Sequence, residues 1–227
     1  MYAKRAVLPY EDENMSILNE ISELLQAGKR KQVAELCTQA IEQGIPAAEI
    51  LNDGLMPGMD VIGEKFKEGE VFVPQVLIAA RAMKAGTEVL KPYLNDGEST
   101  AKGKLCIGTV KGDLHDVGKN LVAMMMEGKG FEVIDLGVDV PPEVFVQTAR
   151  DEHCDIVCCS ALLTTTMPVM ADIVKAFEDA GIRQDVKIMV GGAPVTDEFA
   201  AKIGADAYTP DAASAADKAI ELVSEAN

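Results

Sequence analysis

Apolar residues recur every three or four positions through the amino-terminal part of the chain, which is the spacing of one face of an α-helix. Glycine, proline and polar residues interrupt this pattern at short intervals and mark where helices begin and end. The predicted helices span about 14–28, 33–44, 46–54, 55–69 and 74–90. The third is expected to end at Asn52-Asp53-Gly54, because that sequence is typical of a turn. Amphipathic helices joined by short loops pack against one another, so we expect residues 1–94 to form an antiparallel helical bundle.

The pattern changes beyond residue 103, where short runs rich in β-branched residues alternate with helical stretches. The predicted strands span 105–110, 131–136, 155–160, 186–192 and, more weakly, 205–209, and the predicted helices span 117–129, 142–152, 167–180, 196–203 and 212–225. Near-continuous apolar strands that alternate with helices indicate a parallel sheet covered on both faces. Five strands in a domain of this size favour the flavodoxin-like (Rossmann-type) strand order 2-1-3-4-5.

A polar segment, NDGESTAKG at 95–103, separates the two patterns. It lacks large apolar side chains and is therefore predicted to be a linker that acts as a hinge. The expected fold class is α + α/β: a helical bundle at 1–94, the linker at 95–103, and a flavodoxin-like five-stranded parallel sheet domain at 104–227.

Charge and composition exclude several classes of function. The 227 residues include 21 Lys and Arg against 37 Asp and Glu, a net charge of −16. A phosphate backbone repels such a surface, so nucleic acid is not an expected partner. No apolar run approaches the roughly 18 residues of a membrane-spanning helix, and the first residues lack the apolar core of a secretory signal. The five cysteines are expected to be buried and reduced, and their spacing fits no zinc site, so we expect a cytoplasmic protein without a membrane partner.

Unusual residues gather where a sheet of this order binds ligands, at the carboxyl ends of its first and third strands. The first strand runs into GTVKGDLHDVGKN at 108–120, in which His115 stands between Asp113 and Asp116. The third strand runs into SALLTTT at 160–166, and the fourth ends in Gly191-Gly192. Small and hydroxyl residues are therefore expected to line a slot with a histidine at its rim. Asp139-Val140-Pro141-Pro142, after the second strand, is expected to border the same site.

Three interpretations of the histidine loop compete. A phosphate-binding loop is disfavoured, because five residues separate Gly112 from Gly118 and Asn120 stands where a hydroxyl residue is needed. In a second interpretation, Asp113 or Asp116 caps the helix that follows and His115 is merely exposed. In the third, His115 ligates a metal through one ring nitrogen while the other donates to a carboxylate. Capping and ligation are compatible with each other.

At these residues the sequence resembles a known family. Asp113-x-His115-x-x-Gly118, Ser160-x-Leu162 and Gly191-Gly192 resemble the signature of cobalamin bound with its own base displaced and a histidine in place of that base. The helical segment 55–84 resembles the cap domain of the same family, so the resemblance covers nearly the whole chain. It is closest to the corrinoid proteins of anaerobic methyltransferase systems, which are relatives of the cobalamin modules of methionine synthase.

The resemblance implies roles for individual residues. His115 would be the lower cobalt ligand, Asp113 would accept from its other ring nitrogen, and Thr166 would be the next hydroxyl, where the family often has serine. Ser160 and the glycine pair would leave room for the displaced nucleotide tail. The implied cofactor-binding set is Gly112, Asp113, Leu114, His115, Asp116, Val117, Gly118, Ser160, Leu162, Thr164, Thr166, Gly191 and Gly192, with Met56 and Met59 of the cap against the upper corrin face. The family implies no catalytic residue in this chain.

The same resemblance implies a methyl carrier that uses cobalamin or a related corrinoid. Cobalt(I) would accept a methyl group from a substrate-specific methyltransferase, and methyl-cobalt(III) would donate it to a second methyltransferase acting on a pterin or thiol. A reductive activase would be a further partner. The chain would therefore be the corrinoid subunit of a methyltransferase system and not catalytic by itself.

Two alternatives stay open. A subunit of an adenosylcobalamin-dependent mutase would resemble residues 103–227 alone, so the helical half argues against it. A cobalamin-sensing regulator would have a helical cap, but it needs a DNA-binding module for which neither the length nor the charge leaves room. His153 precedes the third strand at its amino end and is expected to be structural or exposed, and Met124-Met125-Met126 is expected to pack in the core.

Overall fold

The computed structural model describes residues 9–94 and 101–225, with side chains from residue 14 onward. The chain forms two compact units, Met1–Thr100 and Ala101–Asn227. Most of the predicted linker, at 95–100, lies outside the described residues. Its role as a hinge and the predicted domain boundaries stay predictions.

The first unit is entirely helical in its described part. Its elements are α1 (Pro9–Gln26), α2 (Arg30–Glu42), α3 (Ala47–Glu49), the π-helix η1 (Ile50–Leu55), α4 (Met56–Lys67), α5 (Val73–Leu90) and the 3-10 turn η2 (Lys91–Tyr93). The apolar stripes turn inward to form its core, and Ile21, Leu25, Val33 and Leu90 are fully buried. The predicted helical bundle is therefore confirmed.

The chain does not break at Asn52-Asp53-Gly54, where the sequence predicts the end of a helix. Instead α3 passes through η1 into α4 without leaving the helical conformation. Gly54 is buried against α1, and a Cβ there would lie 3.4 Å from the Leu18 side chain. Packing against α1 therefore uses the glycine as a small residue, and its tendency to form a turn is overridden.

The second unit is built on a parallel sheet in the order β2-β1-β3-β4-β5, as predicted. The strands are β1 (Lys104–Thr109), β2 (Glu132–Asp135), β3 (Ile156–Ser160), β4 (Lys187–Gly191) and β5 (Ala207–Tyr208). In the register of the sheet, Thr109 lies opposite Ser160, and Ser160 lies opposite Gly191. The last residues of the three central strands therefore meet at one edge, where the following loops begin.

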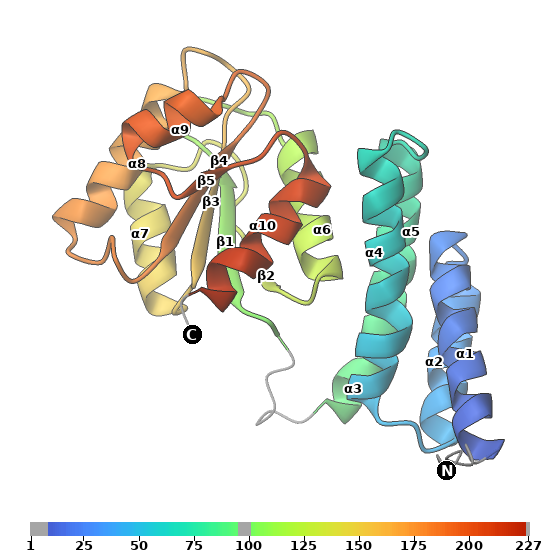
Figure 1. Cartoon of the computed structure of the whole chain (residues 1–227). Coiled ribbons are helices and arrows are strands. Elements are labelled where there is room, and N and C mark those ends of the chain that lie inside the picture. The colour runs from blue at the N-terminus through green and yellow to red at the C-terminus, as the bar shows by residue number, and fades with distance from the viewer. Residues whose placement is uncertain (1–8, 95–100, 226–227) are drawn as a thin grey trace, which may run out of the picture. The chain divides into compact units, whose positions relative to one another are not determined.

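Helices cover both faces of this sheet (Figure 1). They are α6 (Val117–Gly128), α7 (Pro142–Asp151), α8 (Pro168–Asp179), α9 (Asp197–Ile203) and α10 (Ala212–Ser224). Helices α6 and α10 pack together on one face, and α7, α8 and α9 lie on the other. Phe145 and Phe177 anchor the core on the second face. On α6, Met125 and Met126 are buried as expected for core residues, whereas Met124 is half-buried.

The five cysteines are free and buried, as the sequence predicts. Burial raises the pKa of Cys37 and of Cys158 to about 12 in each case, so these thiols stay protonated at neutral pH. Within the part of the chain that the structure describes, no helix combines the length and the apolar character needed to cross a membrane.

We expect Phe145→Ala to lower the free energy of unfolding of the second unit by about 3–5 kcal/mol, because it leaves a cavity against β1. The ring is fully buried and approaches Gly108 so closely that a Cβ there would lie 2.8 Å from it. Hydrogen exchange of β1 and β3 amides measures the change in this unit alone. Val144→Ala, at the exposed neighbouring position, is the control. A loss as small as that of the control would contradict this account of the core.

Candidate functional site

The site is built on the loop between β1 and α6. Gly112 adopts a φ of +83°, which glycine reaches without strain, and the amide of Asp113 donates to the Val110 carbonyl at 3.1 Å. This tight turn points the Asp113 side chain back under the loop, where it is completely buried. The turn therefore explains why a carboxylate so close to the surface is shielded from water.

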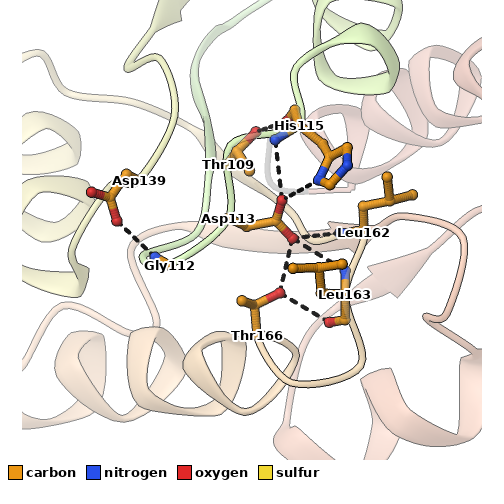
Figure 2. A network of polar contacts seen from close by, with 8 residues as sticks. All are labelled: Thr109, Gly112, Asp113, His115, Asp139, Leu162, Leu163 and Thr166. Atoms are coloured by element: carbon orange, nitrogen blue, oxygen red, sulfur yellow. Dashed lines mark hydrogen bonds and ion pairs between the residues drawn. The ribbon is translucent and has the colours of Figure 1, made fainter.

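The Asp113 carboxylate joins the β1 loop to the β3 loop (Figure 2). Its Oδ1 accepts from the His115 amide at 3.1 Å and lies 2.8 Å from the His115 Nδ1. Its Oδ2 accepts from the amides of Leu162 at 2.8 Å and Leu163 at 3.2 Å, and from the Thr166 hydroxyl at 2.8 Å. Both oxygens are therefore saturated with donors from two loops.

These donors also set the charge of Asp113. Burial by itself raises the pKa of the carboxyl group. Hydrogen bonds from the His115 ring, the Leu162 amide, the His115 amide and the Thr166 hydroxyl outweigh burial, so the net pKa lies well below its ordinary value. The group is a carboxylate at any physiological pH and can only accept hydrogen bonds.

His115 presents one ring nitrogen to Asp113 and the other outward. Because Asp113 only accepts, it favours the tautomer with a proton on Nδ1, which leaves a lone pair on Nε2 at the far side of the ring. The side chain is 53% exposed, so this nitrogen can be reached from outside. The His115 carbonyl accepts from the buried Thr109 hydroxyl at 2.7 Å, which fixes the backbone that carries the ring.

The surroundings of His115 limit what kind of metal it could bind. No group of three or more His, Cys, Asp or Glu side chains suited to a metal ion occurs in the described residues. A metal ion at His115 would therefore have to bring its other ligands with it. A planar macrocycle that already holds its metal meets this requirement.

The segments that meet at Asp113 also carry exposed apolar side chains. Leu114 and Val117 are 72% and 69% exposed, and Leu162 and Leu163 on the β3 loop are about 40% exposed. Large apolar side chains gathered around one polar group are typical of a ligand-binding surface. The sequence predicts Leu114, Val117 and Leu162 as binding residues but does not single out Leu163.

The glycine pair after β4 has two different roles. Gly192 adopts a φ of +129°, and a Cβ there would lie 1.8 Å from the Ala161 carbonyl oxygen, so only glycine fits between the two loops. A Cβ at Gly191 would meet nothing within 4 Å. Gly191 therefore borders open space beside Ser160, the neighbouring residue in the sheet register.

Helix α6 differs from the expectation that an aspartate side chain caps it. Asp116 occupies the N-cap position, but its side chain makes no capping hydrogen bond. It accepts instead from the Asn120 side chain at 3.2 Å, and the Asp113 oxygens are engaged elsewhere. The capping prediction is wrong, because the Asp113 oxygens join the β1 and β3 loops and the Asp116 side chain bonds to Asn120.

Lys119 and Asp135 form an ion pair that sequence analysis did not identify. The Lys119 Nζ lies 2.6 and 2.7 Å from the two Asp135 oxygens, and the lysine is 2% exposed. A phosphate-binding loop would direct this lysine at its ligand, so the pair disfavours that interpretation further. An isolated Lys and Asp sixteen residues apart give no sequence signal.

The remaining candidates lie in four places. Thr164 is exposed in the β3 loop, and Gly118 faces open space in the first turn of α6. Met56 and Met59 belong to the helical unit, where they are only 5% and 1% exposed. Their contact with a ligand stays a prediction. His153 is exposed in the turn before β3, at the amino end of that strand, as expected for a residue outside the site.

Comparison with known proteins decides the family. Residues 103–219 and 17–91 each match a family model described as a B12 binding domain. A corrinoid protein of Desulfitobacterium hafniense is 39% identical over 93% of this chain and 97% of its own. A trimethylamine corrinoid protein of Methanosarcina mazei is 46% identical over 77% of this chain and 82% of its own. The chain belongs to the B12-binding corrinoid proteins.

A solved structure agrees with this assignment. The methanol:cobalamin methyltransferase complex MtaBC of Methanosarcina barkeri contains a chain that superposes with a TM-score of 0.84 at 28% identity, over 97% of this corrinoid protein and 86% of that chain. That chain therefore shares the fold of both units.

The residues of this corrinoid protein fit the cofactor that its family binds. His115 offers one nitrogen ligand, which suits a cobalt ion whose corrin ring supplies the equatorial ligands. The exposed leucines and Val117 suit the apolar part of a macrocycle. The open space at Gly191 suits a segment of ligand inserted beside β3, where a larger side chain would stand in its way.

We expect Asp113→Asn to destabilise the cofactor-free second unit by about 1–3 kcal/mol at pH 7, because the amide accepts more weakly from the same donors and adds one of its own. The lowered pKa of Asp113 means that its carboxylate contributes stability above the unfolded-state pKa of about 3.9 and loses it as the pH falls further. The difference between variant and wild type should therefore shrink below about pH 4.

Urea unfolding at pH 7, 5 and 3 measures this difference. Asp179→Asn removes an exposed carboxylate from a surface ion pair and serves as the matched control. An equal difference at pH 7 and pH 3 would show that the carboxylate charge is not the stabilising feature.

Proposed function

We propose that this corrinoid protein carries a methyl group between two methyltransferases. The observation that carries the proposal is the Asp113-His115 pair, which leaves a lone pair on Nε2 in a loop that also carries the exposed apolar side chains of Leu114 and Val117. When bound, the corrinoid supplies a cobalt ion that takes up and releases the methyl group. The chain itself supplies binding, orientation and control of the axial ligand.

The proposed roles of the chain's own residues follow from their contacts. His115 would hold the cobalt of the corrinoid through Nε2, and the negative charge of Asp113 would make its imidazole a stronger donor to the metal. Thr166 holds Asp113 from the other side through its hydroxyl, and its amide donates to the Leu163 carbonyl at 3.1 Å, which keeps the β3 loop closed around the carboxylate. Any change of charge on the pair would alter the strength of the axial bond.

The nucleotide tail of the cofactor is proposed to enter at the carboxyl ends of β1 and β3, beside Gly191 at the end of β4. Ser160 and Gly191 offer small side chains there, and Gly192 lets the β3 and β4 loops approach each other behind it. Gly112, Gly118, Asp116 and Thr164 complete the rim. Met56 and Met59 are proposed to meet the upper face, which requires that part of α4 become more exposed than it is here.

The proposed partners are a substrate-specific methyltransferase, a second methyltransferase acting on a pterin or thiol, and a reductive activase. The names of the relatives support the first, since they include trimethylamine and dimethylamine corrinoid proteins. Substrate choice is then a property of the methyltransferase and not of this chain. The buried, free cysteines support a reducing compartment such as the cytoplasm.

We expect His115→Ala to remove the axial nitrogen ligand while the protein keeps most of its affinity for cobalamin, because the corrin and its tail supply most of the contact area. Electron paramagnetic resonance of the cobalt(II) form should show nitrogen hyperfine splitting that ¹⁵N-labelled histidine alters in the wild type and that the variant lacks. The chain has two histidines, so His153→Ala is the matched control and should leave the spectrum unchanged. Splitting from the cofactor's own base in the wild type would overturn the proposed ligation.

We expect Gly191→Leu to fold normally but to bind cobalamin at least about tenfold more weakly, the ratio that corresponds to about 1.4 kcal/mol. The new side chain meets no protein atom near its Cβ and instead fills the space proposed for the tail. Thermal unfolding of the cofactor-free protein controls for damage to the fold, and equilibrium titration with cobalamin measures the affinity. Wild-type affinity in a normally folded variant would mean that the tail lies elsewhere.

A further inference from the structure

Asp139, in the loop after β2, contacts the histidine loop on both sides of Asp113. Its Oδ1 accepts from the Gly112 amide at 2.7 Å, and its own amide donates to the Asp113 carbonyl at 3.0 Å (Figure 2 shows the first contact). One residue thus holds the backbone immediately before and immediately after the buried carboxylate.

The backbone of Asp139 is itself in an uncommon conformation. Its φ of +56° lies in the left-handed region, which is strained for a residue with a Cβ. Flanking contacts hold it there: the Thr109 amide donates to Gly137, and the Val140 amide donates to the Thr109 carbonyl. The β2 loop is therefore tied to the end of β1 at several points, and Asp139 is the residue that bonds to Asp113 itself.

We propose that Asp139 is a positioning residue for the axial histidine: by fixing the backbone on both sides of Asp113, it holds the carboxylate where it can pair with His115. The side chain of Asp113 is anchored by the β3 loop, and its main chain is anchored by Asp139. Without the bond from the Gly112 amide, the segment that carries Asp113 is held less firmly, and the pairing of its carboxylate with the His115 amide and ring is weakened. The role in ligation rests on the proposed function; the role in ordering the loop does not.

Two substitutions separate the hydrogen bond from the backbone conformation. Asp139→Gly keeps the left-handed φ without strain and removes the acceptor. Asp139→Asn keeps an acceptor oxygen, and asparagine tolerates the same φ. A matched control is Asp155→Gly, because the exposed Asp155 also accepts from a backbone amide, that of Lys104 at 2.8 Å, at the opposite end of β1.

The first experiment uses the cofactor-free protein and measures amide hydrogen exchange by NMR. We expect Asp139→Gly to speed exchange at the His115 amide about two- to tenfold, which corresponds to the loss of an ordinary hydrogen bond. Asp139→Asn should restore most of the protection, and Asp155→Gly should leave His115 unchanged. Amides of β4 report the global stability of the unit. Faster exchange at His115 is therefore attributed to the loop only where it exceeds the increase at the β4 amides. Faster exchange at Gly112 with unchanged exchange at His115 would overturn the proposal.

The second experiment uses the protein reconstituted with cobalamin and measures histidine ligation and cobalamin affinity separately. We expect the histidine-ligated fraction of the cobalt(II) form, measured by electron paramagnetic resonance, to fall in Asp139→Gly and to recover in Asp139→Asn. Affinity for cobalamin should stay within about twofold, because the apolar surface and Gly191 are unaltered. An unchanged ligated fraction in Asp139→Gly would refute the role in ligation. If the wild-type protein bound no cobalamin, the proposed function would fail, while the exchange experiment would still decide whether Asp139 orders the loop.

Discussion

The site depends on one buried carboxylate. Asp113 is completely shielded, and a charged group in that position is tolerated only because donors surround it. Those donors come from its own loop and from the loop after β3, so the same interactions that satisfy the charge also join the two loops. Removing any donor would weaken the connection between loops and the hold on His115 together. The hydrogen bonds that connect the two loops therefore also orient the histidine.

The sheet makes this arrangement possible. Since β1 and β3 are neighbours in register, Thr109 and Ser160 end side by side, and the loops that follow start within reach of each other. The β2 strand on the other side of β1 brings Asp139 to the same loop. Three segments far apart in sequence therefore converge on a few residues around Asp113. These segments meet because the chain crosses over β1 on its way from β2 to β3, so that both strands lie beside β1 in the parallel sheet.

Much of this could be predicted from the sequence. The apolar strands and helical stripes predict the order β2-β1-β3-β4-β5, and the loop residues around His115 stand out because their charges and spacing are unusual. What could not be predicted depends on contacts across long stretches of chain. Asp139 is polar in a loop, as many residues are, and its bond to Gly112 is visible only in three dimensions. Asn52-Asp53-Gly54 carries a strong local turn signal, but packing of Gly54 on α1 overrides it.

The π-helix η1 also affects how the helical unit tolerates changes in chain length. A π-turn accommodates one residue more than an α-turn, so a single-residue deletion within Ile50–Leu55 could be absorbed as regular α-helix without breaking the chain's path. After such a change, the residues on either side of the deletion keep their direction around the helix axis, because the α-turn spans with one residue fewer what the π-turn spans. Ile50, which is fully buried, would then stay in the core. The π-turn thus holds one additional residue while the apolar faces of α3 and α4 stay in phase.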